Sequence, residues 1–120
     1  MNEPSSPLLA TAIERAARAV EAAKLQVIGR DWQSREHRLD LVATPGHGIL
    51  AAVEVRAVAH GALGACITAI SEDRIRQLTG AAHEWIREHD ARYDDLWLVI
   101  VMVDPEGSVE LVVGNAAEVA

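Results

Sequence analysis

The sequence predicts a single α/β domain in which a central, mixed β-sheet is flanked by helices. Three observations carry this prediction. The chain has 120 residues, which suffices for one hydrophobic core and is too short for two domains. Half of its residues are hydrophobic and 24% are charged, a balance typical of globular proteins and not of disordered ones. Its apolar positions predict two helices and five strands in the order α-β-β-β-α-β-β.

The first half of the chain is expected to form one helix and three strands. Residues 1–7, which are rich in proline and serine, are interpreted as a loose lead-in to a domain at 8–120. Apolar residues recur at helical spacing over 8–23, and frequent alanine supports a helix there. A Pro-Gly-His-Gly segment at 45–48 predicts a turn between two strands. The three strands are expected at 25–33, 38–44 and 49–57.

The second half is expected to add a helix and two strands. After a connection at 58–69, helical periodicity begins at Ser71 and ends near His89, with acidic residues in the first turn, where the helix dipole favours them. Residues 96–103 are continuously apolar, which indicates a strand that is buried on both faces. A turn then leads to the last strand at 109–113.

The charge balance restricts the classes of partner. There are 18 acidic and 11 basic residues, so the net charge at pH 7 is −7. Proteins that bind nucleic acid usually carry positive charge for phosphate contact, so composition disfavours such a partner. No apolar run reaches the roughly 20 residues of a membrane span, which predicts no membrane partner. Without a visible secretory signal, and with Cys66 as the single cysteine, the chain is expected in the reducing cytoplasm.

The hairpin around residues 45–49 brings four charged residues together. If these five residues form the loop, opposed residues have numbers that sum to 94. Asp40 then lies opposite Glu54, and Arg38 lies opposite Arg56. Residues two apart share one face of a strand, so all four side chains are expected on one face. The residues that alternate with them are apolar and are expected to form a core on the other face: Leu39, Leu41, Val53 and Val55.

The spacing of this quartet leaves two interpretations open. Two close carboxylates are what Mg²⁺ binds, together with water and a substrate phosphate, so Asp40 and Glu54 are candidate metal ligands. The alternative is a cluster of arginine–carboxylate ion pairs on a solvent-exposed sheet face, where each pair contributes about 0–1 kcal/mol. Spacing alone favours the ion-pair cluster.

Several segments carry a family resemblance that extends over nearly the whole chain. They include His-Arg-Leu-Asp-Leu-Val-Ala at 37–43 and Ala-Val-Glu-Val-Arg at 52–56, with further matches at 13–17, 25–32 and 92–94. These segments resemble the YraN-like family of uncharacterised bacterial proteins, which belongs to the restriction-endonuclease-like PD-(D/E)XK superfamily. The resemblance implies a restriction-endonuclease-like fold for residues 8–120. It also implies metal-dependent hydrolysis of phosphodiester bonds in nucleic acid.

The resemblance also implies roles for individual residues. Asp40 and Glu54 correspond to the ligands of the divalent metal, Mg²⁺ or Mn²⁺. Arg56 stands where the family has the lysine that positions or polarises the attacking water, so it completes the candidate catalytic set. Glu14 corresponds to an outlying carboxylate of the same site.

Two arginines depart from the family pattern. Arg56 replaces the lysine, and its guanidinium stays protonated and cannot act as a base. Arg38 replaces a glutamate, so positive charge lies beside both carboxylates and repels a divalent cation. Impaired catalysis is the expected result. The alternative function is a catalytically inactive binding or assembly module, and a third hypothesis is a homodimer formed through an apolar edge or helix.

Overall fold

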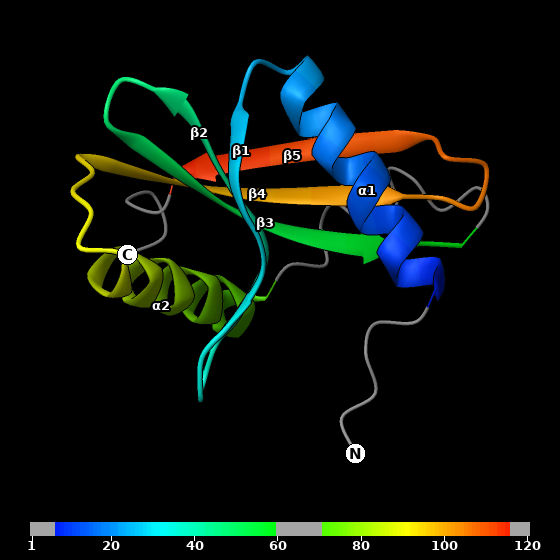
Figure 1. Ribbon diagram of the computed structural model, residues 1–120. Coiled ribbons are helices and arrows are strands. Elements are labelled where there is room, and N and C mark those ends of the chain that lie inside the picture. Colours follow the sequence, from blue (N-terminus) through cyan, green and yellow to red (C-terminus); the bar gives the residue numbers. More distant parts are fainter. Residues whose placement is uncertain (1–6, 60–70, 116–120) are drawn as a thin grey trace.

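A five-stranded sheet with a helix on each face makes up the part of the chain that the computed structural model describes, residues 7–59 and 71–115 (Figure 1). Fold class and element order are confirmed, and the predicted boundaries differ from the observed ones by one or two residues. Neither described helix is long and apolar enough to cross a membrane. The elements are α1 (Pro7–Ala22), β1 (Gln26–Gln33), β2 (Arg38–Gly46), β3 (Ile49–Ala57), α2 (Glu72–Glu88), β4 (Asp95–Val103) and β5 (Val109–Asn115).

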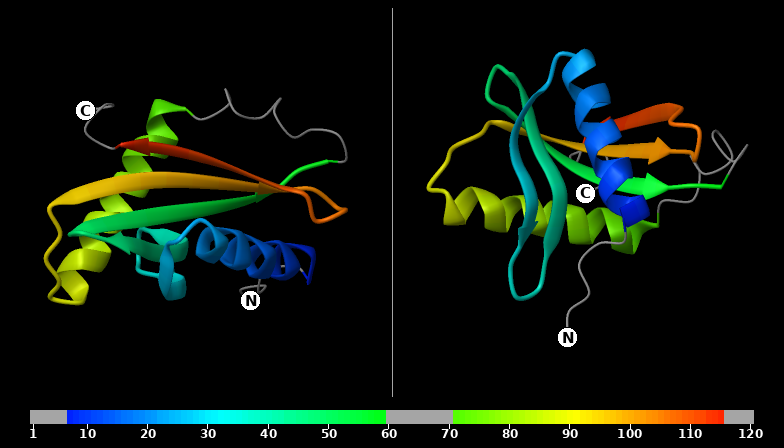
Figure 2. Two further views of the ribbon diagram at one scale, coloured as in Figure 1. Left: turned by 90° about the horizontal axis from the view of Figure 1, so that it is seen from above. Right: turned by 45° about the vertical axis from the view of Figure 1, so that its right-hand side comes forward.

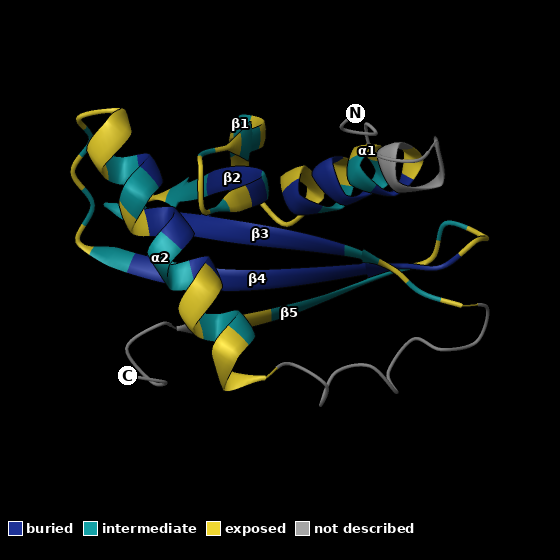
Figure 3. Ribbon diagram, turned by 90° about the horizontal axis from the view of Figure 1, so that it is seen from below, coloured by how far each residue is buried: buried dark blue, intermediate teal, exposed yellow. Residues whose placement is uncertain are grey.

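The sheet has the strand order β1-β2-β3-β4-β5. Neighbouring strands are antiparallel except β3 and β4, which pair in parallel from Ile49–Asp95 to Ala57–Val103. Most residues of β3 and β4 are buried, as the dark ribbons of Figure 3 show, whereas much of β5 is partly exposed. The continuous apolar run of β4 is therefore explained by cover on both faces, as predicted.

Each helix covers its own core (Figure 2). The small side chains of α1 pack against one face of the sheet, which contributes Leu41, Val53 and Val99. The apolar stripe of α2 packs against the other face, which contributes Leu50 and Ile100. Both faces of the central strands are thus buried.

The predicted start and end of α2 are confirmed by its caps. The Oγ atom of Ser71 accepts a hydrogen bond from the Arg74 N–H at 3.1 Å, which satisfies one of the free donors of the first turn. The acidic residues Glu72 and Asp73 follow, next to the positive end of the helix dipole. At the other end, the His89 N–H donates to the Trp85 carbonyl at 3.0 Å.

The turn between β2 and β3 is shorter than predicted. The register that sums to 94 is confirmed at Leu41–Val53 and at the next two pairs, but it shifts by one at Gly46–Ile49. The hydroxyl of Thr44 accepts from the Gly46 N–H at 2.9 Å and holds this irregular segment. His47 and Gly48 then close the turn, with φ values of 59° and 73°. The predicted five-residue loop at 45–49 is therefore wrong, although the register away from the turn is right.

The face predicted for Leu39 is also wrong. Leu41, Val53 and Val55 belong to the α1 core as expected, whereas Leu39 packs into the α2 core. The β2–β3 ladder ends at the Leu41–Val53 pair, so the outer part of β2 pairs with β1 but not with β3. The end of the β1–β2 hairpin bends toward α2 and extends past it (Figure 1). There Trp32 Nε1 donates to Glu88 Oε1 at 3.0 Å.

Parts of the sequence interpretation concern segments outside the described residues. These are positions 1–6 of the predicted lead-in, positions 60–69 of the predicted connection, and Cys66.

Candidate functional site

A hollow of about 220 Å³ lies on the α2 face of the sheet, where the apolar core ends. Strands β2 and β3 and the first turns of α2 surround it, and Leu78 forms part of its wall. The predicted quartet is therefore brought together, on a face that a helix covers and not on an open sheet face. The polar residues that line the hollow are Arg38, Asp40, Glu54, Arg56 and Arg74.

Glu54 is the buried carboxylate of this site, with 6% of its surface exposed. Its Oε2 accepts a hydrogen bond from Arg56 Nε at 2.5 Å, and its Oε1 accepts from Arg74 Nε. Taking a carboxylate out of water costs several kcal/mol unless it is paired. The two guanidinium groups, one on each oxygen, offset that cost and hold Glu54 between β3 and α2.

The side chain of Asp40 accepts a backbone hydrogen bond where the β2–β3 ladder has ended. Its Oδ2 accepts the Val55 backbone N–H at 2.8 Å, just beyond the last backbone pair. Its Oδ1 lies 3.4 Å from Arg38 Nη2. Burial raises the pKa of the Asp40 carboxyl, and the charge of Glu54 adds to the rise. The Val55 hydrogen bond and Arg38 act in the opposite direction, but burial outweighs them.

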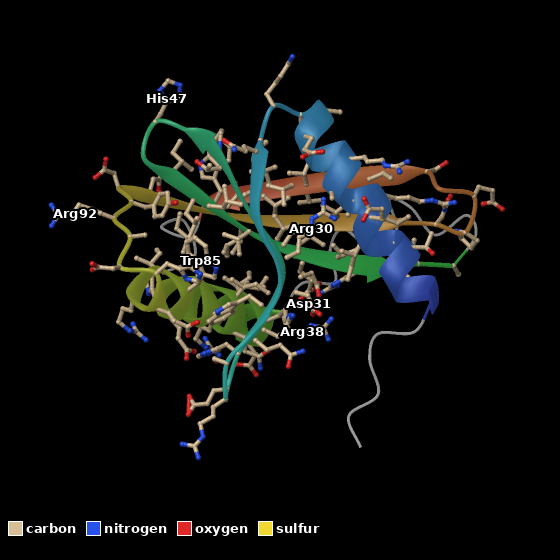
Figure 4. The ribbon with its side chains drawn as sticks, in the orientation of Figure 1. Arg30, Asp31, Arg38, His47, Trp85 and Arg92 are labelled. Atoms are coloured by element: carbon tan, nitrogen blue, oxygen red, sulfur yellow. The ribbon has the colours of Figure 1, made fainter. Side chains whose placement is uncertain are left out.

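Arg38 links the hollow to the β1 strand. Its Nη2 lies 3.6 Å from Asp31 Oδ1, and Figure 4 shows both side chains beside the lower part of β1, near Arg30. Arg30 in turn donates to Glu14 Oε2 at 3.0 Å. Glu14 therefore lies on α1 within an exposed ion pair and does not line the hollow.

Arg74 is the site residue that the sequence interpretation missed. It lies one helical turn before Leu78, whose side chain is buried against the sheet, so both residues face the same side of α2. That spacing could have placed Arg74 on the buried face, but only the packing of α2 on β3 shows that it reaches Glu54. Its Nη1 also donates to Gln77 Oε1 at 2.9 Å.

The contacts in the hollow determine how well it suits a cation. Mg²⁺ binds through free carboxylate oxygens, whereas both oxygens of Glu54 and Oδ2 of Asp40 already accept hydrogen bonds. By formal charge, the three arginines and two acidic residues that line the hollow sum to +1. In this arrangement the residues do not fit a divalent cation. Across residues 7–59 and 71–115, no three His, Cys, Asp or Glu side chains gather as a metal centre.

A second polar cluster fastens the β1–β2 turn to α2. His37 Nδ1 lies 2.6 Å from Glu84 Oε1, and Ser34 Oγ donates to the same oxygen at 2.8 Å. The hydrogen bond with His37 lowers the pKa of the Glu84 carboxyl, and the hydrogen bond from Ser34 lowers it further. A Cβ at Gly80 would lie 3.0 Å from His37 Nε2, so glycine at this position lets the imidazole ring approach the helix. The cluster thus fixes the residue next to Arg38 in the chain.

Residues 13–101 match the family described as "Uncharacterised protein family UPF0102", a range that contains every residue of the hollow. A UPF0102 protein of Beutenbergia cavernae is 36% identical over 91 residues, which cover 73% of this chain and 74% of that protein. One of Halorhodospira halophila is 32% identical over 83 residues, 68% of each chain. One of Rhodococcus opacus is 32% identical over 102 residues, 79% of this chain and 83% of that one. These matches show that the chain belongs to the UPF0102 family, and they confirm the predicted resemblance to a family of uncharacterised bacterial proteins.

Proposed function

We propose that this chain is a nucleic-acid-binding domain that keeps a nuclease-like fold and does not hydrolyse phosphodiester bonds. One observation carries the proposal: each oxygen of the Glu54 carboxylate contacts an arginine. Metal-dependent hydrolysis needs carboxylates that face a cation, and here they face guanidinium groups. Arg56, at the position of the family's lysine, cannot give up its proton to serve as a base.

A second candidate function is metal-dependent hydrolysis of nucleic acid. Asp40 and Glu54 come from different strands and line the same hollow, which favours this candidate. In that case the two carboxylates would bind Mg²⁺ or Mn²⁺, and Arg56 would position the scissile phosphate.

A binding and cleavage experiment separates the two candidates. The full chain is incubated with single-stranded, duplex and branched DNA and RNA, first with EDTA and then with Mg²⁺ or Mn²⁺. We expect binding in EDTA and intact substrates under all conditions. Metal-dependent cleavage that Glu54→Ala abolishes would overturn the proposed function in favour of the second candidate. Failure to bind any of these nucleic acids, with or without metal, would overturn both.

A gain-of-function variant tests the reason given for the loss of hydrolysis. The triple variant Arg38→Glu, Arg56→Lys, Arg74→Gln removes the guanidinium groups that contact Asp40 and Glu54. Calorimetric titration with Mn²⁺ is expected to show binding in the triple variant and none in the unmodified chain. Arg76→Gln is the matched control, because Arg76 is an exposed arginine of α2 that pairs with Asp73 outside the hollow. An unchanged titration of the triple variant would mean that the arginines are not what excludes the metal.

A further inference from the structure

We propose that the hollow is a metal-independent binding site for a phosphate group and that Arg38, Arg56 and Arg74 supply its donors. The phosphate can belong to a nucleic acid, in which case this inference deepens the proposed function and rests on it, or it can be free in solution. The site would then recognise its ligand by charge and by hydrogen bonds from the planar guanidinium groups, and not through a bound cation.

The hydrogen bonds already present leave donors for such a ligand. A guanidinium carries five N–H groups in a planar fork, the geometry that suits phosphate oxygens. Arg56 uses Nε for Glu54, and among the described residues no other hydrogen bond engages its two terminal amino groups. Arg74 uses Nε for Glu54 and Nη1 for Gln77, and no hydrogen bond joins its Nη2 to another residue that the structure describes. Glu54 therefore holds two arginines by their inner nitrogens.

Exposure and charge also suit an anion. The side chains of Arg38, Arg56 and Arg74 are 40%, 27% and 37% exposed, so solvent reaches all three. The residues that line the hollow carry a formal net charge of +1, in a chain whose formal net charge is −7. A volume of about 220 Å³ admits a phosphate group with ordered water. Arginines held in place before the ligand arrives lose little conformational freedom on binding, which favours affinity.

The charge of Asp40 distinguishes a phosphate site from a metal site, because it has opposite effects on the affinities for the two ligands. A phosphate group near Asp40 is repelled by its carboxylate, whereas a divalent cation is attracted by it. Asp40→Asn removes the charge and keeps an amide oxygen that can accept the Val55 N–H. The variant is therefore expected to bind phosphate more tightly, whereas a metal ligand changed in this way would weaken the site.

The test uses the full chain in EDTA and two probes, inorganic phosphate and a short single-stranded oligonucleotide. Binding is followed by calorimetry for phosphate and by fluorescence anisotropy for the oligonucleotide. Arg56→Gln and Arg74→Gln are each expected to weaken binding of both probes by roughly tenfold or more. Asp40→Asn is expected to tighten it by about threefold or more, and the control Arg76→Gln is expected to change neither.

The outcomes separate this inference from the proposed function. Oligonucleotide binding that survives in Arg56→Gln and Arg74→Gln would overturn the phosphate site and leave the proposed function in place. Phosphate binding without oligonucleotide binding would support the site and overturn the proposed function. Loss of phosphate binding in Asp40→Asn would contradict the site. Should a variant at Arg56 or Arg74 unfold, Arg38→Gln replaces it, since the side chain of Arg38 is 40% exposed and pairs with Asp40 and Asp31 at 3.4 and 3.6 Å.

Discussion

The partly buried carboxyl group of Asp40 accepts a backbone hydrogen bond from Val55. Its pKa is raised above the ordinary value of 3.8, so the folded chain holds this proton to higher pH than the unfolded chain does. Between the unfolded and folded pKa values the native state binds more protons. Asp40 therefore contributes most to stability below the unfolded pKa, and the contribution falls as pH rises through the folded pKa.

We expect Asp40→Asn to remove this part of the pH dependence. The difference in unfolding free energy between the variant and the unmodified chain should grow in favour of the variant as pH rises from about 3.5 to 7. Urea denaturation at several pH values measures it. A difference that is constant over this range would contradict the raised pKa.

The geometry of individual site residues could be predicted only in part. Strand periodicity and the hairpin register place Asp40 and Glu54 together, and the structure agrees because the ladder at Leu41–Val53 has that register. Arg74 could not be placed, since no local pattern tells which strand α2 crosses. The ion pair between Glu14 and Arg30 could not be predicted either, because it depends on how α1 packs beside β1.

At the scale of elements, α2 closes the hollow and anchors it through Leu78. This side chain is 1% exposed and packs in the α2 core. Leu78→Ala is expected to cost about 2–5 kcal/mol of unfolding free energy. Leu78→Met, which roughly preserves volume, should cost under about 1.5 kcal/mol. Denaturant unfolding of both variants measures the two effects. Equal, small losses would mean that α2 packs loosely over the sheet.

Gly80 and His37 should act as a coupled pair between α2 and the β1–β2 turn. Alanine in place of a helical glycine usually stabilises by about 0.5–1 kcal/mol. Here its Cβ would lie 3.0 Å from the His37 ring, so the gain should be lost. In a His37→Ala background, Gly80→Ala should recover the gain. A double-mutant cycle of unfolding free energies measures the coupling, and identical effects of Gly80→Ala in both backgrounds would contradict it.

The elements themselves were predictable to within two residues because their apolar periodicity and caps are local properties. The bend of the β1–β2 hairpin was not. It depends on where the ladder with β3 stops and on a register shift in β1 between Val27 and Gly29. Strict alternation therefore assigned Leu39 to the wrong core.

For the whole molecule, the small positive site lies within a net charge of −7. Binding of nucleic acid through one phosphate releases few counterions, so its salt dependence should be shallow. We expect log K against log salt to have a slope of about −0.7 for a single-stranded oligonucleotide. Anisotropy titrations from 50 to 300 mM salt would measure it. A slope several times steeper would mean that a broad basic surface takes part.

The parallel pairing of β3 with β4 has a consequence for how the chain folds. β1, β2 and β3 follow one another through short turns, and such hairpins form in about 1–10 μs. β4 reaches β3 only after the chain has returned from Ala57 to Asp95, a longer closure with a larger entropic cost. We expect β4 to dock late, so Val99→Ala should speed unfolding more than it slows refolding in stopped-flow experiments. The reverse pattern would place β4 in the folding nucleus.

In this folding order, Asp40 and Glu54 meet before the sheet is complete. Their mutual repulsion would then oppose the β2–β3 hairpin at its open end. Two cations are already present at that stage: Arg38 lies beside Asp40 on β2, and Arg56 lies two residues after Glu54 on β3. Arg74 arrives only when α2 docks. If β4 and α2 dock late, as expected, Arg38 and Arg56 would offset this repulsion until the helix covers the hairpin.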